Sequence, residues 1–409
     1  MKSTAPRLLS LNSYHYRRGG SEVVFLEHDA LFRELGWETA VMSMHHPKNL
    51  PSPWSKYFIE ELELGRTNGL ADKVVKASKA IWSFETQRKL RELLAVFPAD
   101  VAHLHCIYHH LSPSALPVLH EAGIPIVLTA HDLKIACPAY KMLNSEGVCE
   151  RCRDGSVINV LKHRCIHKSV LASTIVMLES GLSRTMNTWK RYVNRVVAPS
   201  EFYRNKLIEW GWPAEQVVYV PNYVDANVFT PSYEPSDYIL YAGRLSEEKG
   251  VPTLVKAAAK AGVKLRVAGT GPLEAELKAL PNADSIEWLG YCSGDALWDQ
   301  VRGARALVLP SEWYENAPMS VLEAFASGTP VVGADIGGIP EMITPETGWV
   351  FPSGDVDALA GVLTEVAGKP DAVIAEMGRH ARERCATKFS RARYIEGIQT
   401  VYRELGVKF

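Results

Sequence analysis

The sequence predicts an α/β protein built from two doubly wound domains, in which helices cover both faces of a parallel sheet. Three observations lead to this fold class. The chain has 409 residues, which is more than a single hydrophobic core usually serves. Short β-branched runs alternate with helical patterns along nearly the whole chain, which is typical of parallel sheets. These runs form two series, separated by the proline-bearing stretch at 221–237.

The two series supply the strands of the two domains. An amphipathic stretch from Glu22 to Leu35 predicts a helix after the first strand. The first series predicts strands at 7–12, 37–44, 100–106, 124–132, 195–200 and 216–222. The second series predicts strands at 237–246, 263–271, 285–290, 304–310 and 329–335, with helical patterns between them.

The final segment, 391–406, predicts a terminal packing helix. Its apolar residues recur at helical spacing, and they are Tyr394, Ile398, Val401, Tyr402 and Leu405. We expect a first domain over 1–221 and a second over 222–387. The C-terminal helix, within 388–409, is expected to pack back on the first domain.

The composition is that of a soluble globular protein, and the net charge of −1 points to no class of partner. No apolar run reaches the ~18 residues of a membrane span. The N-terminal segment has no apolar core of signal-peptide length, so we expect a cytoplasmic protein. Seven cysteines in such a chain indicate thiols or metal ligands rather than disulfides.

Several polar motifs follow predicted strands of the second domain, where ligands of doubly wound sheets bind. "YAGRLSEEKG" presents Arg244 and Lys249 on a loop, which suits a diphosphate but also fits two solvated charges. "AGTGP" contains Gly271 but does not complete the dinucleotide pattern, because position 274 is Glu. "WLGY" ends at Tyr291 and indicates either a contact to a base edge or a turn.

The stretch "WYENAPMSVLEAFASG" sets one glutamate before a helix and another two turns inside it. Ala317 is predicted as the N-cap and Pro318 as the first helical residue, so Glu315 precedes the helix and Glu323 lies within it. A capped surface helix with acidic residues near its start is the alternative interpretation. The outward-pointing amides at the helix start, which suit a phosphate, are those of Met319 and Ser320.

Two segments of the first domain place further groups at strand ends. Gly19 and Gly20 follow the first strand and let the backbone approach a ligand closely, and Ser21 is a candidate cap for the next helix. "TAHD" puts His131 and Asp132 at the end of a buried strand, where a histidine is more often a hydrogen-bonded core residue.

Together these motifs resemble the GT-B glycosyltransferases, specifically the large retaining family 4. The resemblance covers most of the chain, and the motifs occur in the family's order. They are "GGSE", "TAHD", "VAPSE", "VPNYVD", "AGRLSEEKG", "AGTGP", "WLGY", "ENAPMSVLEAFASGTPVV" and "GGIPE". The resemblance implies two Rossmann-like domains facing a cleft. It also implies a hexosyl-type transferase that uses a UDP- or GDP-sugar, retains anomeric configuration and needs no catalytic divalent metal. The acceptor would be a glycan, a lipid-linked sugar or a small molecule, in bacterial polysaccharide or glycolipid synthesis.

The resemblance also implies roles for individual residues. Glu323 would accept hydrogen bonds from the ribose, and Glu315 would contact the donor sugar. Arg244 and Lys249 would neutralise the leaving diphosphate. His131 would position the donor rather than deprotonate the acceptor, and we expect no carboxylate of "TAHD" or "GGSE" to be an inverting base. The expected catalytic residues are His131, Glu315, Arg244 and Lys249. The other expected donor contacts are Gly19, Gly20, Gly271, Tyr291, Asn316, Ala317, Met319, Ser320 and Glu323.

One departure affects the donor sugar. The chain has "ENAP" where many family members have "EGFG", so Asn316 and Pro318 alter the sugar-side surface. The sequence therefore leaves the donor open.

A cysteine-rich segment follows "TAHD" and predicts one structural zinc ion, since four thiols suit a closed tetrahedral site. His163 and His167 are candidate substitutes, and unliganded reduced cysteines are the alternative. The predicted ligands are Cys137, Cys149, Cys152 and Cys165. The isolated cysteines, expected to be packing residues, are Cys106, Cys292 and Cys385.

A basic amphipathic stretch at 162–195 fits either a membrane-surface segment or an ordinary helix pair on a domain face. The first interpretation implies peripheral association with the inner face of the membrane.

Three other functions fit parts of the sequence but not all of it. A sugar-nucleotide epimerase shares the two-domain fold, but the two spaced glutamates and "GRLSEEKG" disfavour it. A zinc-bearing nucleic-acid-binding protein is disfavoured by the near-zero net charge and the lack of a nucleic-acid module, so no nucleic-acid partner is expected. A Rossmann dehydrogenase is disfavoured by the incomplete glycine pattern.

Overall fold

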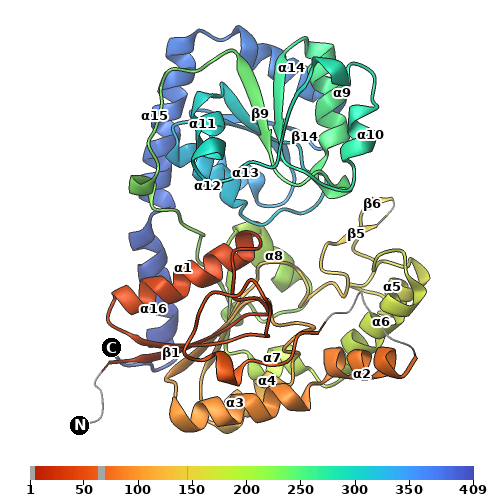
Figure 1. Cartoon of the computed structure of the whole chain (residues 1–409), viewed down its shortest axis with the longest axis vertical. Coiled ribbons are helices and arrows are strands. Elements are labelled where there is room, and N and C mark those ends of the chain that lie inside the picture. Colours follow the sequence, from red (N-terminus) through yellow and green to blue (C-terminus); the bar gives the residue numbers. More distant parts are fainter. Residues whose placement is uncertain (1–4, 63–69, 145) are drawn as a thin grey trace.

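A computed structural model describes residues 5–62, 70–144 and 146–409 (Figure 1). Those residues form two parallel sheets of six strands each and one short antiparallel hairpin. The predicted fold class is confirmed. No helix in the described part of the chain is long and apolar enough to cross a membrane.

The first sheet belongs to the N-terminal half of the chain. All its strand pairs are parallel. In spatial order the strands are β2 (Glu38–Met42), β1 (Arg7–Leu11), β3 (Val101–Leu104), β4 (Ile126–Thr129), β7 (Arg195–Ala198) and β8 (Val217–Tyr219). Every one of them lies within a range predicted from the sequence. The strand order reverses between β1 and β3, so a crevice is expected beyond their carboxyl ends.

The second sheet is also parallel throughout. In spatial order its strands are β11 (Glu287–Gly290), β10 (Lys264–Ala268), β9 (Tyr238–Ala242), β12 (Ala306–Leu309), β13 (Val331–Asp335) and β14 (Gly348–Pro352). The order reverses between β9 and β12. The edge strand β14 was not predicted, and neither was the hairpin of β5 (Leu143–Asn144) and β6 (Gly147–Val148).

Helices cover the sheets of both domains (Figure 1). In the first domain they are α1 (Gly20–Glu34), α2 (Leu70–Ile81), α3 (Phe84–Val96), α4 (Ala115–Glu121), α5 (Ile158–Lys162), α6 (Val170–Thr185), α7 (Thr188–Tyr192) and α8 (Glu201–Glu209). In the second they are α9 (Val251–Ala261), α10 (Glu274–Lys278), α11 (Asp295–Gly303), α12 (Met319–Ala326), α13 (Ile339–Met342), α14 (Val356–Gly368) and α15 (Asp371–Lys388).

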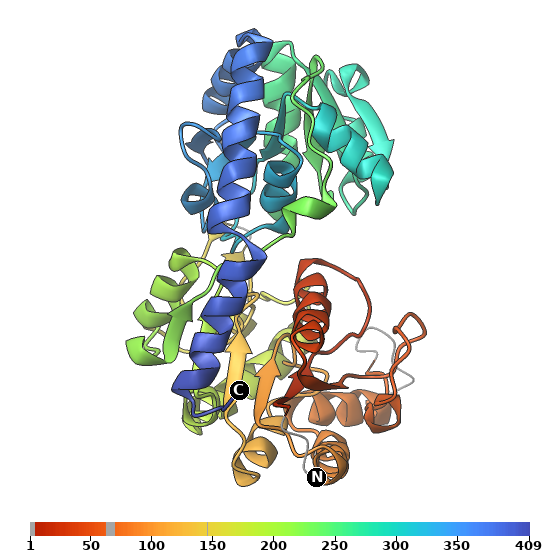
Figure 2. The same cartoon turned by 90° about the vertical axis from the view of Figure 1, so that its left-hand side faces the viewer.

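The chain crosses back to the first domain at its C-terminal end. Figure 2 shows α15 running along the second domain and α16 (Arg391–Glu404) continuing along the first. On α16, Tyr394 and Tyr402 are buried in one cluster with Leu8 of β1 and Phe32 of α1. The aromatic face of α16 therefore packs against the first sheet.

Two helix starts differ from the predicted ones by one or two residues. α12 begins at Met319, because Pro318 keeps an extended ψ of 124° and occupies the N-cap position that was predicted for Ala317. α1 begins at Gly20 with Gly19 as its N-cap, so Ser21 lies inside the helix and is not the cap. Both corrections leave the first free amides of these helices at the cleft.

Candidate active site

Two adjoining cavities follow the carboxyl ends of the strands. A cavity of about 480 Å³ lies between the domains, and one of about 500 Å³ lies within the second domain. Ala242, Gly243, Arg244 and Ser320 line both, so the cavities meet at the loop after β9 and the start of α12. We call the first the interdomain cavity and the second the nucleotide-side pocket.

Two helix N-termini face each other across the interdomain cavity. A Cβ atom on Gly20, at the start of α1, would lie 3.7 Å from Cγ of Met319, at the start of α12. Helix N-termini carry unpaired amides and partial positive charge. The two domains thus present converging sites for an anion.

Lys249 and Glu315 form an ion pair in the wall of this cavity. The Lys249 ammonium lies 2.6 Å from Oε1 of Glu315, which also accepts a hydrogen bond of 2.8 Å from the Ser311 hydroxyl. The lysine also lies over the Trp313 ring, 5.3 Å from its centroid. Glu315 is 6% exposed, so these two partners fix the direction of a nearly enclosed carboxylate.

Arg244 differs from Lys249 in being exposed and in making no ion pair with any described residue. It lies where the two cavities meet. An unpaired guanidinium next to two helix N-termini can bind a phosphate group in two-point fashion.

The glycines of "AGTGP" hold two loops together. A Cβ atom on Gly269 would lie 1.9 Å from the carbonyl oxygen of Gly243, and one on Gly271 would lie 2.2 Å from that of Leu245. These loops also share the hydrogen bonds from Gly243 N to Ala268 O and from Leu245 N to Thr270 O. The pattern therefore reflects close packing of the Arg244 loop, not a completed dinucleotide fingerprint.

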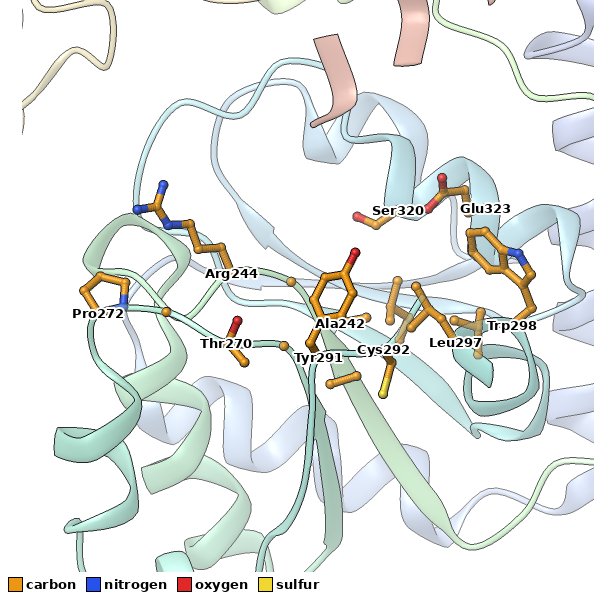
Figure 3. Close-up of a pocket in the computed structure, with 16 residues that line it drawn as sticks. Ala242, Arg244, Thr270, Pro272, Tyr291, Cys292, Leu297, Trp298, Ser320 and Glu323 are labelled. Carbon is orange, nitrogen blue, oxygen red and sulfur yellow. The ribbon is translucent and has the colours of Figure 1, made fainter. Parts of the chain in front are cut away.

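The nucleotide-side pocket runs from a cation to a carboxylate. Figure 3 shows Arg244 at one end, Glu323 with Trp298 at the other, and Tyr291 between them. Burial raises the pKa of Glu323 to about 7, with Glu27 of α1 raising it further and Arg17 opposing. A desolvated carboxyl with open space beside it is suited to accept hydrogen bonds from a diol.

The first domain contributes buried histidines and one carboxylate. His131 lines the interdomain cavity, and its Nε2 lies 2.8 Å from Nδ1 of His105. Burial lowers the pKa of His131 to about 4, so its ring is neutral at neutral pH. Asp132 also lines the cavity, and burial raises its pKa to about 6. Asp132 is thus the carboxyl group of "TAHD" at this cavity, and the expectation that it is not an inverting base stays a prediction.

Hydrogen bonds tie the domains together next to the cavity. The Asn316 amide donates to the Ala130 carbonyl oxygen (2.8 Å), and its oxygen accepts from the Ser200 hydroxyl (2.9 Å). The Tyr203 hydroxyl donates to the Tyr314 carbonyl oxygen at 3.0 Å. Asn316 was predicted as a contact to the donor sugar. In the structure, both ends of its side-chain amide form hydrogen bonds to the other domain.

The structure brings together nearly all predicted site residues. The interdomain cavity is lined by His131, Glu315, Arg244, Lys249, Gly20, Asn316, Ala317, Met319 and Ser320. The nucleotide-side pocket is lined by Arg244, Gly271, Tyr291, Ser320 and Glu323. Gly19 is the N-cap of α1 and lies outside both linings.

Sequence reasoning missed several lining residues. Leu297 and Trp298 of α11 line the nucleotide-side pocket, and Trp313 and Tyr140 line the interdomain cavity. Leu297 and Trp298 lie on the amphipathic helix α11, where apolar residues are expected to pack in the core. The sequence therefore did not indicate that they line a pocket. Cys106 and Cys292, predicted as packing residues, also line the two cavities, while Cys385 is buried in the core of the second domain.

The cysteine-rich segment does not form a metal-binding arrangement in the structure. Among the described residues, no three His, Cys, Asp or Glu side chains are grouped so as to hold a metal ion. Burial raises the pKa of Cys137 to about 12 and also raises the pKa values of Cys152 and Cys165. In this arrangement, burial therefore favours the thiol form of Cys137, Cys152 and Cys165 over the thiolate that a metal would need.

Comparison with known proteins gives two family matches that together span most of the chain. Residues 18–228 match the model of Glycosyltransferase Family 4, and residues 227–384 match that of Glycosyl transferases group 1. The amylovoran biosynthesis glycosyltransferase AmsK of Erwinia amylovora is 29% identical over 218 residues, which cover 48% of this chain and 53% of AmsK. The match thus spans about half the length of that relative.

Solved structures share the fold at lower identity. Sucrose-phosphate synthase from Thermosynechococcus elongatus has a TM-score of 0.71 at 18% identity, with 98% of this chain and 99% of that chain covered. Anabaena HepE, solved in complex with UDP and glucose, has a TM-score of 0.64 at 16% identity, with 98% and 99% covered. The family model matches residues 18–228, the sequence motifs occur in the family's order, and both sheets face the site. These three observations point to the same family. The chain belongs to glycosyltransferase family 4 and has the GT-B fold.

Proposed function

We propose that this protein is a retaining glycosyltransferase that moves a hexosyl group from a nucleotide-diphosphate sugar to an acceptor. The observation that carries the proposal is the meeting of Arg244, the Lys249–Glu315 pair and two helix N-termini at one cavity. Fixed positive charge at that point would stabilise a departing diphosphate. Transfer of labelled sugar from a nucleotide sugar to acceptor is the direct test.

The donor is proposed to be a UDP- or GDP-sugar. Its nucleoside would occupy the pocket of Tyr291 and Trp298, with the ribose hydroxyls donating to Glu323. HepE, which shares the fold, is described with UDP and glucose, and this supports UDP as the first choice. Thermal-shift screening against UDP-, GDP- and ADP-sugars tests the choice, and stabilisation by ADP-sugars alone would contradict it.

The reaction is proposed to proceed with retention and without a catalytic divalent metal. Lys249 is committed to Glu315, Arg244 is free to bind phosphate, and His131 is neutral, so donor positioning is the role these groups support. An inverting route would instead make Asp132 the base. The NMR coupling constant at the anomeric carbon of the product separates the two. Activity that disappears with EDTA and returns with Mg²⁺ would contradict the metal-free proposal.

The acceptor is proposed to be a glycan, a lipid-linked sugar or a small molecule in bacterial polysaccharide or glycolipid synthesis, as the name of AmsK suggests for that relative. An epimerase of the same fold would instead convert its nucleotide sugar with no acceptor present, which product analysis detects.

Peripheral membrane association is proposed through α6. Leu171, Leu178 and Leu182 are exposed at helical spacing on the face opposite the buried Ser173 and Ser180. Exposed apolar side chains in a basic stretch suit a surface of anionic lipid. This would place the protein at the cytoplasmic face of the membrane. Co-sedimentation with vesicles of anionic but not neutral lipid is expected, and Leu178→Glu should weaken it.

Structural zinc remains a proposal that needs a different arrangement of thiols. Zinc binding would require Cys137, Cys149, Cys152 and Cys165 to lose their protons and converge. The segment follows His131 and lies on the first-domain side of the cleft, so metal loss should impair acceptor use more than nucleotide binding. Elemental analysis of purified protein checks it, and much less than one zinc per chain would contradict it.

A further inference from the structure

His131 is one end of a row of histidine rings that crosses the first sheet. The ring of His105 lies nearly parallel to that of His131 (centroids 5.1 Å apart, planes at 20°) and to that of His103 (5.0 Å, 17°). His103 in turn contacts His28 of α1 at 4.4 Å. His28, His103 and His105 are fully buried, whereas His131 is partly exposed at the cavity. The row therefore has a single member that can meet a ligand.

One hydrogen bond joins the rings of His105 and His131, and one of the two rings supplies its proton. Their facing nitrogens, Nδ1 of His105 and Nε2 of His131, are 2.8 Å apart. Burial lowers the pKa of both rings below the ordinary value, so both are neutral at neutral pH. In a bond between two neutral imidazoles, one nitrogen donates and the other accepts. Which one donates decides what His131 offers to the cavity.

The surroundings of His105 decide the direction of this bond. Its other nitrogen, Nε2, is buried and has no hydrogen-bond partner among the described residues. If Nε2 carried the proton, an N–H donor would be enclosed without an acceptor, and orphaned buried N–H groups are rare in proteins. With the proton on Nδ1, the one N–H of His105 is used, and it donates to His131. The proton of His131 then resides on its own Nδ1.

We propose that His105 is a positioning residue that holds His131 as the Nδ1–H tautomer with a fixed ring plane. His131 then presents an N–H donor for an oxygen of the bound donor sugar. Its accepting nitrogen is occupied, so it does not serve as a base. This inference rests on the proposed sugar-transfer function for its kinetic consequences, but not for the tautomer itself.

His103 provides the matched control. Its Nδ1 lies 2.7 Å from the Tyr402 hydroxyl and its Nε2 lies 2.7 Å from the Thr129 hydroxyl. It is as buried as His105 and lies against the His105 ring, but it makes no hydrogen bond to His131. A loss of packing in the histidine row is therefore shared by variants of both residues, and a loss of the tautomer is specific to His105.

The first measurement needs no change at His105. In ¹⁵N-histidine-labelled wild-type protein, the signals of His131 are assigned by their absence in His131→Gln. We expect a protonated Nδ1 and an unprotonated Nε2. The opposite pattern, or an average of the two tautomers, overturns the proposal. This result does not depend on activity, so it stands apart from failure of the proposed function, which would appear as no sugar transfer by the wild type.

The second measurement compares variants with the nucleotide sugar that supports transfer. His105→Phe removes the donor and is expected to lower kcat about tenfold or more. The affinity of this variant for the free nucleoside diphosphate should be unchanged, because that ligand lacks the transferred hexosyl group. His105→Asn keeps an N–H at the same distance from the backbone and should recover most of the activity. If His103→Phe lowers kcat as much as His105→Phe, or if His105→Asn recovers nothing, the role of His105 is packing and the proposal is wrong.

Discussion

The carboxyl edges of the two sheets face one cleft but carry different chemistry. The edge of the second sheet holds the charges Arg244, Lys249, Glu315 and Glu323. The edge of the first holds His131 in its neutral form, with Asp132 as the one carboxyl of "TAHD". Under the proposed function, the second domain would supply electrostatic stabilisation and the first would supply directed hydrogen bonds.

The strand orders of the two sheets explain part of this difference. In the second sheet the order reverses between β9 and β12, and the loops after these two strands carry Arg244 and Glu315. In the first sheet the reversal lies between β1 and β3, and the loops there carry Gly20 and Cys106. At this reversal the cavity is therefore lined by small residues, Gly20, Ser21 and Cys106, whereas the second sheet places charged side chains at its own reversal.

The largest expected effect tests the charged edge. Lys249→Met should lower kcat by about 10²- to 10³-fold, because a fixed cation at a developing charge stabilises the transition state by several kcal/mol. It also leaves the enclosed Glu315 carboxylate with Ser311 alone. Steady-state kinetics at saturating donor check this. Lys278→Met, which breaks the surface pair with Glu274, is the control and should be neutral. Equal activity of the two variants would contradict the comparison.

The second prediction concerns the affinity of the charged edge for nucleotide. Glu323→Ala should weaken binding of the free nucleoside diphosphate about 10- to 150-fold, since a hydrogen bond to a charged group contributes about 1.5–3 kcal/mol. In the wild type, affinity should fall as pH drops through about 7, because the carboxyl then gains its proton. Calorimetric titration between pH 6 and 8 measures both. A pH-independent affinity would remove Glu323 from the ribose.

The same raised pKa predicts how stability depends on pH. The unfolded carboxyl ionises near 4.5, whereas the folded one ionises near 7. Folding therefore favours the protonated form, and this stabilisation is present below about pH 4.5 and lost as pH rises through about 7. Glu323→Gln stays neutral, so it should exceed the wild type in Tm at pH 8 and lose that advantage by pH 5. A Tm difference that does not change with pH would contradict the assigned pKa.

A smaller effect is expected from the loop that carries Arg244. Gly271→Ala places a Cβ atom 2.2 Å from the Leu245 carbonyl oxygen, so the two loops must move apart. Nucleotide affinity should fall severalfold, with a Tm loss of a few degrees for a clash costing about 1–3 kcal/mol. Gly361→Ala on α14 meets no atom within 4 Å and serves as the control. Unchanged affinity in Gly271→Ala would show that Arg244 tolerates a displaced loop.

The sequence predicted the fold well because parallel strands in doubly wound sheets are short, apolar and separated by helices. β14 escaped because its run, Gly348–Pro352, begins with glycine, ends with proline and has no helical pattern of clear length before it. The charged edge was predictable because its residues follow strands in recognisable motifs. The hydrogen bond between His105 and His131 was not predictable, because these residues are 26 positions apart in the sequence and meet only when β3 and β4 lie side by side. The hydrogen bonds of Asn316 were not predictable for a similar reason, since its partners Ala130 and Ser200 lie in the other domain.

The smallest expected effect concerns how the two edges are held against each other. Asn316→Ala removes both hydrogen bonds that link the loop before α12 to Ala130 and Ser200. Each such bond contributes about 0.5–1.5 kcal/mol, and the link from the Tyr203 hydroxyl to the Tyr314 carbonyl oxygen remains. The closed arrangement should therefore be less populated, and KM for the nucleotide sugar should rise about two- to tenfold while affinity for free nucleoside diphosphate changes less. Kinetics and small-angle scattering, which reports domain opening, check this together. Asn205→Ala, at an exposed position of α8, is the control, since among the described residues its side chain hydrogen-bonds the neighbouring Arg204 alone. If Asn316→Ala weakens nucleotide and sugar binding equally with no change in scattering, Asn316 is a donor contact rather than an interdomain link. The original sequence interpretation of that residue would then be the correct one.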